Sequence, residues 1–196
     1  GSPACIANVL RNNVRYHNME ILESGYGISL RPLALFALKN YTHDDGIDPM
    51  VKAINAMLFK LEGQVIFRHP EYNMDDRLLF HKIDLTTGTV TLDSGTYELT
   101  TTDFPTFNPA DPYTLSPEEH CIMTELQNEF MQSERLQKHM RFLYSHGSMY
   151  RCFNNNLLFH GSLPLNDDGS FKEIYFDGRP YKGRAFMDHA DHVARQ

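Results

Sequence analysis

The sequence predicts an α+β fold with a helical N-terminal half, a small antiparallel β-meander, one long helix and a last group of strands. Three observations lead to this prediction. Apolar residues recur at helical spacing through most of the first 68 residues. Between residues 78 and 99 the period changes to short runs rich in β-branched and aromatic residues, with glycine-containing turns between them. A capping box at Ser116–Glu119 then opens a helix that keeps one apolar face.

The N-terminal half is expected to hold four helices, at residues 3–16, 18–24, from 29 to about 38, and 49–68. Ser2 is placed as an N-cap, and Pro3 takes the first helical position, where its missing N–H costs nothing. Gly25 closes the second helix. Pro70 ends the fourth, because the residue before a proline is disfavoured in the helical region.

The meander is predicted to consist of three short strands, at residues 78–85, 89–92 and 96–99. The Pro-rich stretch 102–112 follows as an extended connection. The helix that begins at the capping box is predicted to continue without a break to about His146, with Gly147 at its end.

The last 50 residues read as two strands at 149–153 and 157–160, a turn at 167–169, a short strand at 173–176 and a helix at 181–195. Asp188, His189, Asp191 and His192 share that last helix. Two histidines at i and i+3 with nearby aspartates could ligate a metal, but this spacing is also typical of a solvated helix face.

Composition indicates an ordinary globular protein of 196 residues, enough for one domain or one and a half. The formal charge of −7 argues against a nucleic-acid footprint. No apolar run is long enough to span a membrane, and the first residues do not form a signal peptide, so a cytoplasmic protein is expected. Cys5, Cys121 and Cys152 each follow or precede apolar residues, and we expect them to be reduced and buried.

The stretch 154–164 carries His160 to the C-terminal end of a short apolar run, and Gly161 and Pro164 stop the strand there. This pattern presents one imidazole at the rim of a sheet, although a single strand-end histidine is also common as a packed or solvated residue. The same four letters, Leu-Leu-Phe-His, end at His81. There the chain continues as strand, so His81 is interpreted as structural.

Several stretches, taken in order, resemble the class III fructose-1,6-bisphosphatases of Firmicutes and some other anaerobes. They are 4–9 with Arg15-Tyr16, 22–28, 111–119, 142–148 and 154–164. These enzymes are calcineurin-like metallophosphoesterases, which hold two metal ions over a β-sandwich. The resemblance implies a hydrolase of gluconeogenesis that converts fructose 1,6-bisphosphate to fructose 6-phosphate and phosphate, with a binuclear Mn²⁺ site.

By this resemblance His160 is a metal ligand, and it is the one ligand that carries over. The family's other ligand blocks do not occur in the sequence, which implies a central fragment that is inactive by itself. The expected divisions are 1–16, a helix of the catalytic domain; 17–147, a helical and β-meander insertion for capping or assembly; and 148–196, strands and a helix of the catalytic domain.

The implied partner is a sugar bisphosphate, with a homo-oligomer possible and with neither nucleic acid nor membrane. Four arginines are candidates to meet substrate phosphates or to form surface ion pairs: Arg11, Arg15, Arg31 and Arg151. The competing interpretation is a non-catalytic helical scaffold or interaction module, which the long helix and the incomplete site favour.

Overall fold

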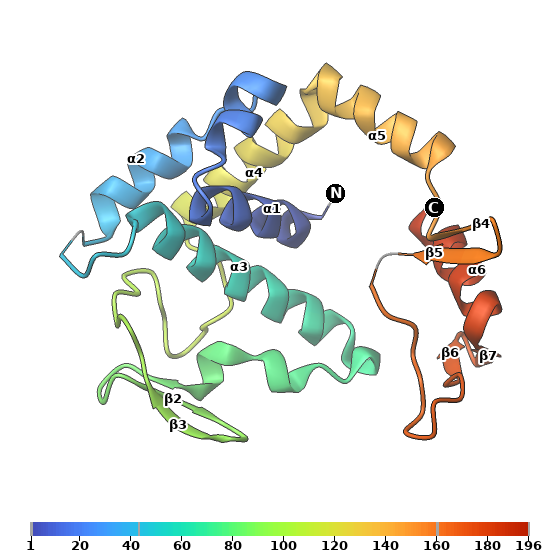
Figure 1. Cartoon of the computed structure of the whole chain (residues 1–196). Helices are drawn as coiled ribbons and strands as arrows, with labels where there is room; N and C mark the ends of the chain where they lie inside the picture. Colours follow the sequence, from blue (N-terminus) through green and yellow to red (C-terminus); the bar gives the residue numbers. More distant parts are fainter. Residues whose placement is uncertain (1, 43, 160, 196) are drawn as a thin grey trace. The chain divides into compact units, whose positions relative to one another are not determined.

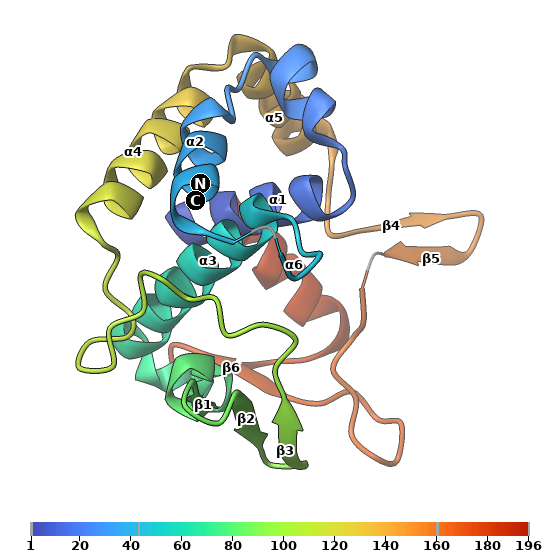
Figure 2. The same cartoon turned by 90° about the vertical axis from the view of Figure 1, so that its left-hand side faces the viewer.

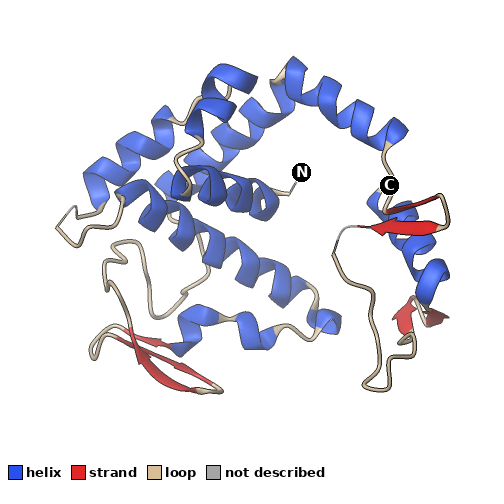
Figure 3. Cartoon of the chain, in the orientation of Figure 1, coloured by secondary structure: helices blue, strands red, loops and turns tan. Residues whose placement is uncertain are grey.

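The computed structural model describes residues 2–42, 44–159 and 161–195. It separates into two compact units, Gly1–Leu136 and Gln137–Gln196 (Figure 1). Helices dominate the first unit, whereas strands of the second pair only as short hairpins (Figure 3). The predicted α+β class is confirmed.

Four helices build the core of the first unit: α1 (Pro3–Arg15), α2 (Arg31–Asn40), α3 (Pro49–Arg68) and α4 (Pro117–Gln132). Both α1 and α2 pack on α3, and α1 also packs on α4. Leu10, Leu33 and Met57 are fully buried where these helices meet. The predicted caps are present, since the Ser2 hydroxyl accepts from the Cys5 amide at 3.3 Å.

The region predicted as a helix at 18–24 forms a π-helical turn, η1 (Ile21–Gly25). Its end is held by residues that follow α4. The Ser133 hydroxyl donates to the Tyr26 carbonyl at 2.6 Å, and Arg135 donates to the Gly25 carbonyl at 2.9 Å. The wide turn therefore presents its terminal carbonyls to donors more than 100 residues away in the sequence.

The prediction of one unbroken helix over 117–146 is wrong. The structure has α4 and α5 (Glu134–His146), with Ser133 between them in an extended conformation (φ −66°, ψ 99°). No Gly or Pro marks the break in the sequence. Ser133 leaves the helical region because its hydroxyl binds Tyr26, while the same oxygen accepts from the Leu136 amide at 3.4 Å.

The meander consists of β1 (Ile83–Asp84), β2 (Thr89–Leu92) and β3 (Gly95–Glu98), paired antiparallel in that order. The predicted strand at 78–85 is only partly correct, since Leu79–Lys82 form a 3₁₀ helix, η4. Two further 3₁₀ turns precede it, η2 (Pro70–Tyr72) and η3 (Asp75–Arg77).

Phe80 explains the turn at η4. Its side chain is 3% exposed and lies among the rings of Phe59, Phe104, Phe107 and Tyr113. An aromatic run predicts a strand by composition, but burial of this one ring in a second apolar cluster bends the backbone into a turn.

The second unit contains two antiparallel hairpins and a helix: β4 (Tyr150–Phe153) with β5 (Asn156–Phe159), β6 (Ile174–Phe176) with β7 (Arg179–Tyr181), and α6 (Gly183–Ala194). Asn154 and Asn155 have φ of 48° and 60°, as a two-residue hairpin turn with primed geometry requires. The strands predicted near 149–153, 157–160 and 173–176 are confirmed. His160 itself lies outside the described residues.

The prediction that the cysteines are buried is wrong, since Cys5, Cys121 and Cys152 are free thiols and all exposed. Successive helical residues point about 100° apart. Ile6 and Ile122 therefore face the core while the cysteines beside them face solvent. None of the helices traced in the described ranges combines the length and apolar character that a bilayer crossing requires.

Candidate functional site

The β4–β5 hairpin leads directly to the position of the predicted metal ligand. Figure 2 shows this hairpin as a separate two-stranded ribbon. Tyr150 pairs with Phe159, the last described residue before position 160. The side chains of Phe153, Leu158 and Phe159 are all exposed, at 60%, 54% and 44%. The hairpin therefore depends on contacts at its base for its position.

Helix α6 supplies those contacts at the start of β4. The Tyr150 hydroxyl donates to Asp188 Oδ1 at 2.7 Å, and the Met149 amide donates to Asp191 Oδ1 at 3.0 Å. The Asp188 carboxylate raises the pKa of the Tyr150 phenol, because it accepts a hydrogen bond from the protonated hydroxyl. The start of β4 is thus hydrogen-bonded to two carboxylates that lie on successive turns of α6.

Arg195, directly after α6, also holds the start of β4 in place. It forms an ion pair with Asp191 at 2.8 Å, which lowers the pKa of that carboxyl group. Its guanidinium also donates to the Gly147 carbonyl at 2.6 Å and to the Tyr144 carbonyl. One arginine therefore caps the last carbonyls of α5 and orients the residues that enter β4.

Two open hollows lie along β4, and residues 148–151 line both of them. The hairpin hollow, of about 410 Å³, is lined by residues 146–151 with Leu158 and Phe159. The helix hollow, of about 470 Å³, is lined by residues 148–152 with Arg184, Asp188 and Asp191. Both volumes fall in the range of small-molecule sites.

Metal ligands do not gather in either hollow. Across residues 2–42, 44–159 and 161–195, no three His, Cys, Asp or Glu side chains are placed to hold a metal ion together. A binuclear site needs several donors and bridging carboxylates. The described residues do not supply that set, and the one predicted ligand, His160, lies outside them.

The alternative metal site on the last helix is not assembled either. The His189 ring stacks on Tyr181 with centroids 4.1 Å apart, and it also contacts Phe176 at 4.7 Å. Asp191 is engaged by Arg195 and the Met149 amide. In the described structure these side chains serve packing and anchoring.

Comparison with known proteins decides the family. A model of the Firmicute fructose-1,6-bisphosphatases matches residues 1–196. The class 3 fructose-1,6-bisphosphatase of Clostridium novyi is 46% identical over 100% of this chain and 32% of its own length. The chain belongs to the Firmicute fructose-1,6-bisphosphatase family.

Other class 3 fructose-1,6-bisphosphatases match this chain with similar identity and coverage. The one from Porphyromonas gingivalis is 45% identical over 100% of this chain and 33% of its own length, and the one from Alkaliphilus metalliredigens is 44% identical with the same coverage. The chain spans about a third of the length of the curated relatives it matches. No solved structure matches it significantly.

The four candidate arginines of this family member differ in their surroundings. Arg11 donates to the Asn12 side chain at 3.4 Å, and Arg15 lies over the Tyr16 ring at 5.8 Å from its centroid. Arg31 is exposed at the start of α2. Arg151 is exposed on β4 and lines both hollows. Only the last of these lies on the element that leads to position 160.

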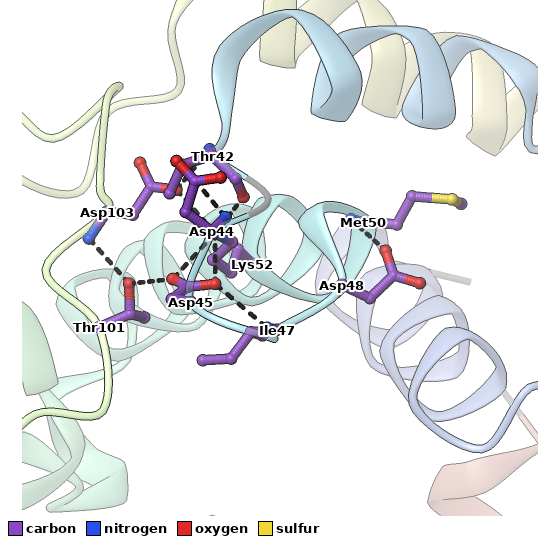
Figure 4. A network of polar contacts seen from close by, with 9 residues as sticks. All are labelled: Thr42, Asp44, Asp45, Ile47, Asp48, Met50, Lys52, Thr101 and Asp103. Carbon is purple, nitrogen blue, oxygen red and sulfur yellow. Dashed lines mark hydrogen bonds and ion pairs between the residues drawn. The ribbon is translucent and has the colours of Figure 1, made fainter.

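A cluster of carboxylates in the first unit is structural. Lys52 Nζ contacts Asp45 Oδ2 at 3.0 Å, Asp103 Oδ2 at 2.8 Å and the Thr42 carbonyl at 2.5 Å (Figure 4). The Thr101 hydroxyl donates to Asp45 Oδ2 at 2.8 Å. The buried ammonium neutralises both carboxylates and joins the loop before α3 to the stretch after β3.

Sequence reasoning did not single out the α6 anchors of this site. Asp188 and Asp191 were considered only as companions of two histidines. The available signal was their separation of three residues on a helix that also ends in an arginine, which places all three on one face. What that face binds depends on tertiary packing, which a single sequence does not reveal.

Proposed function

We propose that this chain is the central part of a fructose-1,6-bisphosphatase that hydrolyses fructose 1,6-bisphosphate to fructose 6-phosphate and phosphate. The observation that supports this most strongly is the family match over residues 1–196 together with 46% identity to a curated class 3 enzyme. The reaction would serve gluconeogenesis in the cytoplasm. In this proposal residues 148–196 contribute strands and a helix to a metallophosphatase sandwich.

The proposed cofactor is a pair of Mn²⁺ ions, with His160 as one ligand. Such ions supply a hydroxide nucleophile at neutral pH and neutralise phosphoryl oxygens. The remaining ligands would come from the two thirds of the relatives' length that this chain does not span. The described residues offer no alternative donor group, so we expect the isolated 196 residues to be inactive.

The chain's own contribution is to position the strand that carries His160. The contacts of Tyr150 with Asp188, and of Met149 and Arg195 with Asp191, hold the start of β4, where Tyr150 pairs with Phe159 at the end of β5. A ligand to a metal pair must be fixed to within a fraction of an ångström, so such supporting contacts matter for activity.

Phosphate release by the full-length protein tests this proposal. We expect fructose 1,6-bisphosphate to yield one equivalent of phosphate and fructose 6-phosphate in the presence of Mn²⁺, with the activity lost after chelation. Full-length protein that releases no phosphate under these conditions, while binding an unrelated protein tightly, would favour the scaffold interpretation instead.

A further inference from the structure

The hairpin hollow has a cationic and polar lining. His146, Ser148 and Arg151 contribute to it beside apolar side chains, and among the described residues that line it none is acidic. The charge of this protein is −7 overall, so a hollow with an arginine and without a carboxylate is a local exception. Such a hollow attracts anions.

Arg151 differs from two other arginines of the same unit, Arg184 and Arg195. Arg184 contacts Asp188 at 3.5 Å, and Arg195 contacts Asp191 at 2.8 Å. Within the described structure Arg151 has no ion-pair or hydrogen-bond partner for its guanidinium. An exposed arginine without a carboxylate partner keeps its five donors available for a ligand.

The helix hollow, which Arg151 also lines, is less suited to an anion. It contains Arg184, but Asp188 and Asp191 also line it. Asp188 already accepts from Tyr150 and pairs with Arg184, so the positive charge there is compensated. An anion in that hollow would face two carboxylates.

The proposed substrate supplies a matching anion. A phosphatase that removes one phosphate from a sugar bisphosphate leaves the other untouched, and that group carries a charge of about −1.5 to −2 at neutral pH. Arginine binds a phosphate through two parallel N–H donors, which fixes both distance and orientation. Arg151 lies opposite Leu158, one position before Phe159, on the hairpin that leads to His160.

We infer that Arg151, in the hairpin hollow beside His146, binds the phosphate of the sugar bisphosphate that is not transferred. This inference rests on the proposed phosphatase function. It makes Arg151 a substrate-binding residue that distinguishes a bisphosphate from a monophosphate, because removing its guanidinium weakens binding only of the substrate that carries the second phosphate.

The test uses full-length protein with Arg151→Ala and Arg151→Lys, and compares fructose 1,6-bisphosphate with fructose 1-phosphate. For the bisphosphate we expect Arg151→Ala to raise KM roughly tenfold or more with kcat changed less than about threefold, as loss of a charged hydrogen-bonded pair implies. Arg151→Lys should give an intermediate KM, since lysine keeps the positive charge but lacks the two parallel N–H donors of the guanidinium. For fructose 1-phosphate both variants should resemble wild type.

Arg179→Ala is the matched control. Arg179 is an exposed arginine on a hairpin strand of the same unit, has no ion pair among the described residues, and does not line the hairpin hollow. It should leave both substrates unaffected. An unchanged KM for the bisphosphate in Arg151→Ala, or an equal rise for both substrates, would overturn the assignment.

Direct titration with inorganic phosphate separates this inference from the function proposed above. Wild-type protein should bind phosphate by calorimetry, and Arg151→Ala should weaken that binding roughly tenfold, whether or not the bisphosphate is hydrolysed. A protein without phosphatase activity whose phosphate binding still depends on Arg151 would overturn the proposed function and keep the anion site. Phosphate binding that is equal in wild type and variant would overturn the site itself.

Discussion

Lys60 Nζ lies 2.7 Å from Glu119 Oε2 in the core of the first unit, with the two side chains 1% and 0% exposed. Both ends are further satisfied. Lys60 donates to the Thr106 carbonyl at 2.9 Å, and the Thr106 hydroxyl donates to Glu119 Oε1 at 2.6 Å. Glu119 also accepts from the Ser116 amide at 2.7 Å, so the capping box of α4 and the buried ion pair share one carboxylate.

Glu119→Gln is expected to destabilise the protein by about 3–5 kcal/mol, because it leaves the Lys60 ammonium buried without an opposite charge. Urea unfolding followed by far-UV circular dichroism measures the change. Glu118→Gln is the matched control, since Glu118 pairs with Lys39 at the surface at 3.1 Å and should cost less than about 1 kcal/mol. Equal losses in the two variants would contradict this account of the core.

Gly63→Ala is expected to destabilise the first unit by about 1–3 kcal/mol through overpacking. A Cβ at position 63 would lie 2.1 Å from Tyr113 Cδ1, and the ring is itself buried. Gly25→Ala is the matched control for overpacking, because the nearest atom to its added Cβ is 3.9 Å away. Thermal unfolding should show a lower Tm for Gly63→Ala and little change for Gly25→Ala.

The lowered pKa of Asp45 makes the stability of the folded protein depend on pH, and the direction of that dependence can be predicted. The Thr101 hydroxyl, the Ile47 amide and Lys52 lower the pKa of Asp45 to about 2 in the folded protein. The unfolded chain, with an ordinary aspartate pKa near 4, binds the proton more tightly. The stabilisation from Asp45 is therefore complete above about pH 4 and is lost as the pH falls towards 2.

Asp45→Asn should reduce the slope of unfolding free energy against pH between about pH 4 and 2 by up to about one proton equivalent. Asp44→Asn is the control, because among the described residues the Asp44 carboxylate makes no ion pair comparable to that of Asp45 with Lys52. Slopes that fall equally in both variants would show that the Asp45 contacts do not hold in solution.

Ser133→Ala is expected to destabilise the junction of α4 and α5 by about 1–2 kcal/mol, since it removes an N-cap and a hydrogen bond to the Tyr26 carbonyl. Hydrogen exchange of the Leu136 amide reports the loss locally. Thr124→Ala is a matched control on α4, because its hydroxyl only donates back to the His120 carbonyl in its own helix. Faster exchange in Thr124→Ala than in Ser133→Ala would contradict this role.

Ser116 and Ser133 show that local contacts could be predicted from the sequence, whereas contacts between distant residues could not. The capping box at Ser116 was predicted and is present, because a cap is a local interaction between residues three apart. The break at Ser133 was missed, because its cause is a carbonyl 107 residues earlier in the chain. Phe80 is a similar case, since its run of residues favours a strand and its burial among distant rings forms a 3₁₀ turn.

The strands of the candidate site were predicted from the sequence, but the tertiary contacts around them were not. Two strands before His160 were predicted from local runs of apolar residues, and both are present. The asparagine turn that joins them as a hairpin was not predicted. The anchoring of Tyr150 by Asp188 and the absence of acidic residues from the described lining of the hairpin hollow could not be predicted, because both depend on how α6 and the end of α5 meet the hairpin.

His160→Ala in the full-length protein tests the central claim most directly, with His81→Ala as its matched control. The two histidines end the same Leu-Leu-Phe-His sequence, and His81 packs edge-on against Tyr113 at 5.0 Å in the first unit. We expect His160→Ala to lower kcat for fructose 1,6-bisphosphate with Mn²⁺ by roughly a hundredfold or more, as loss of a metal ligand implies, and His81→Ala to keep near wild-type kcat. Wild-type turnover in His160→Ala would contradict the assignment of His160 as a metal ligand.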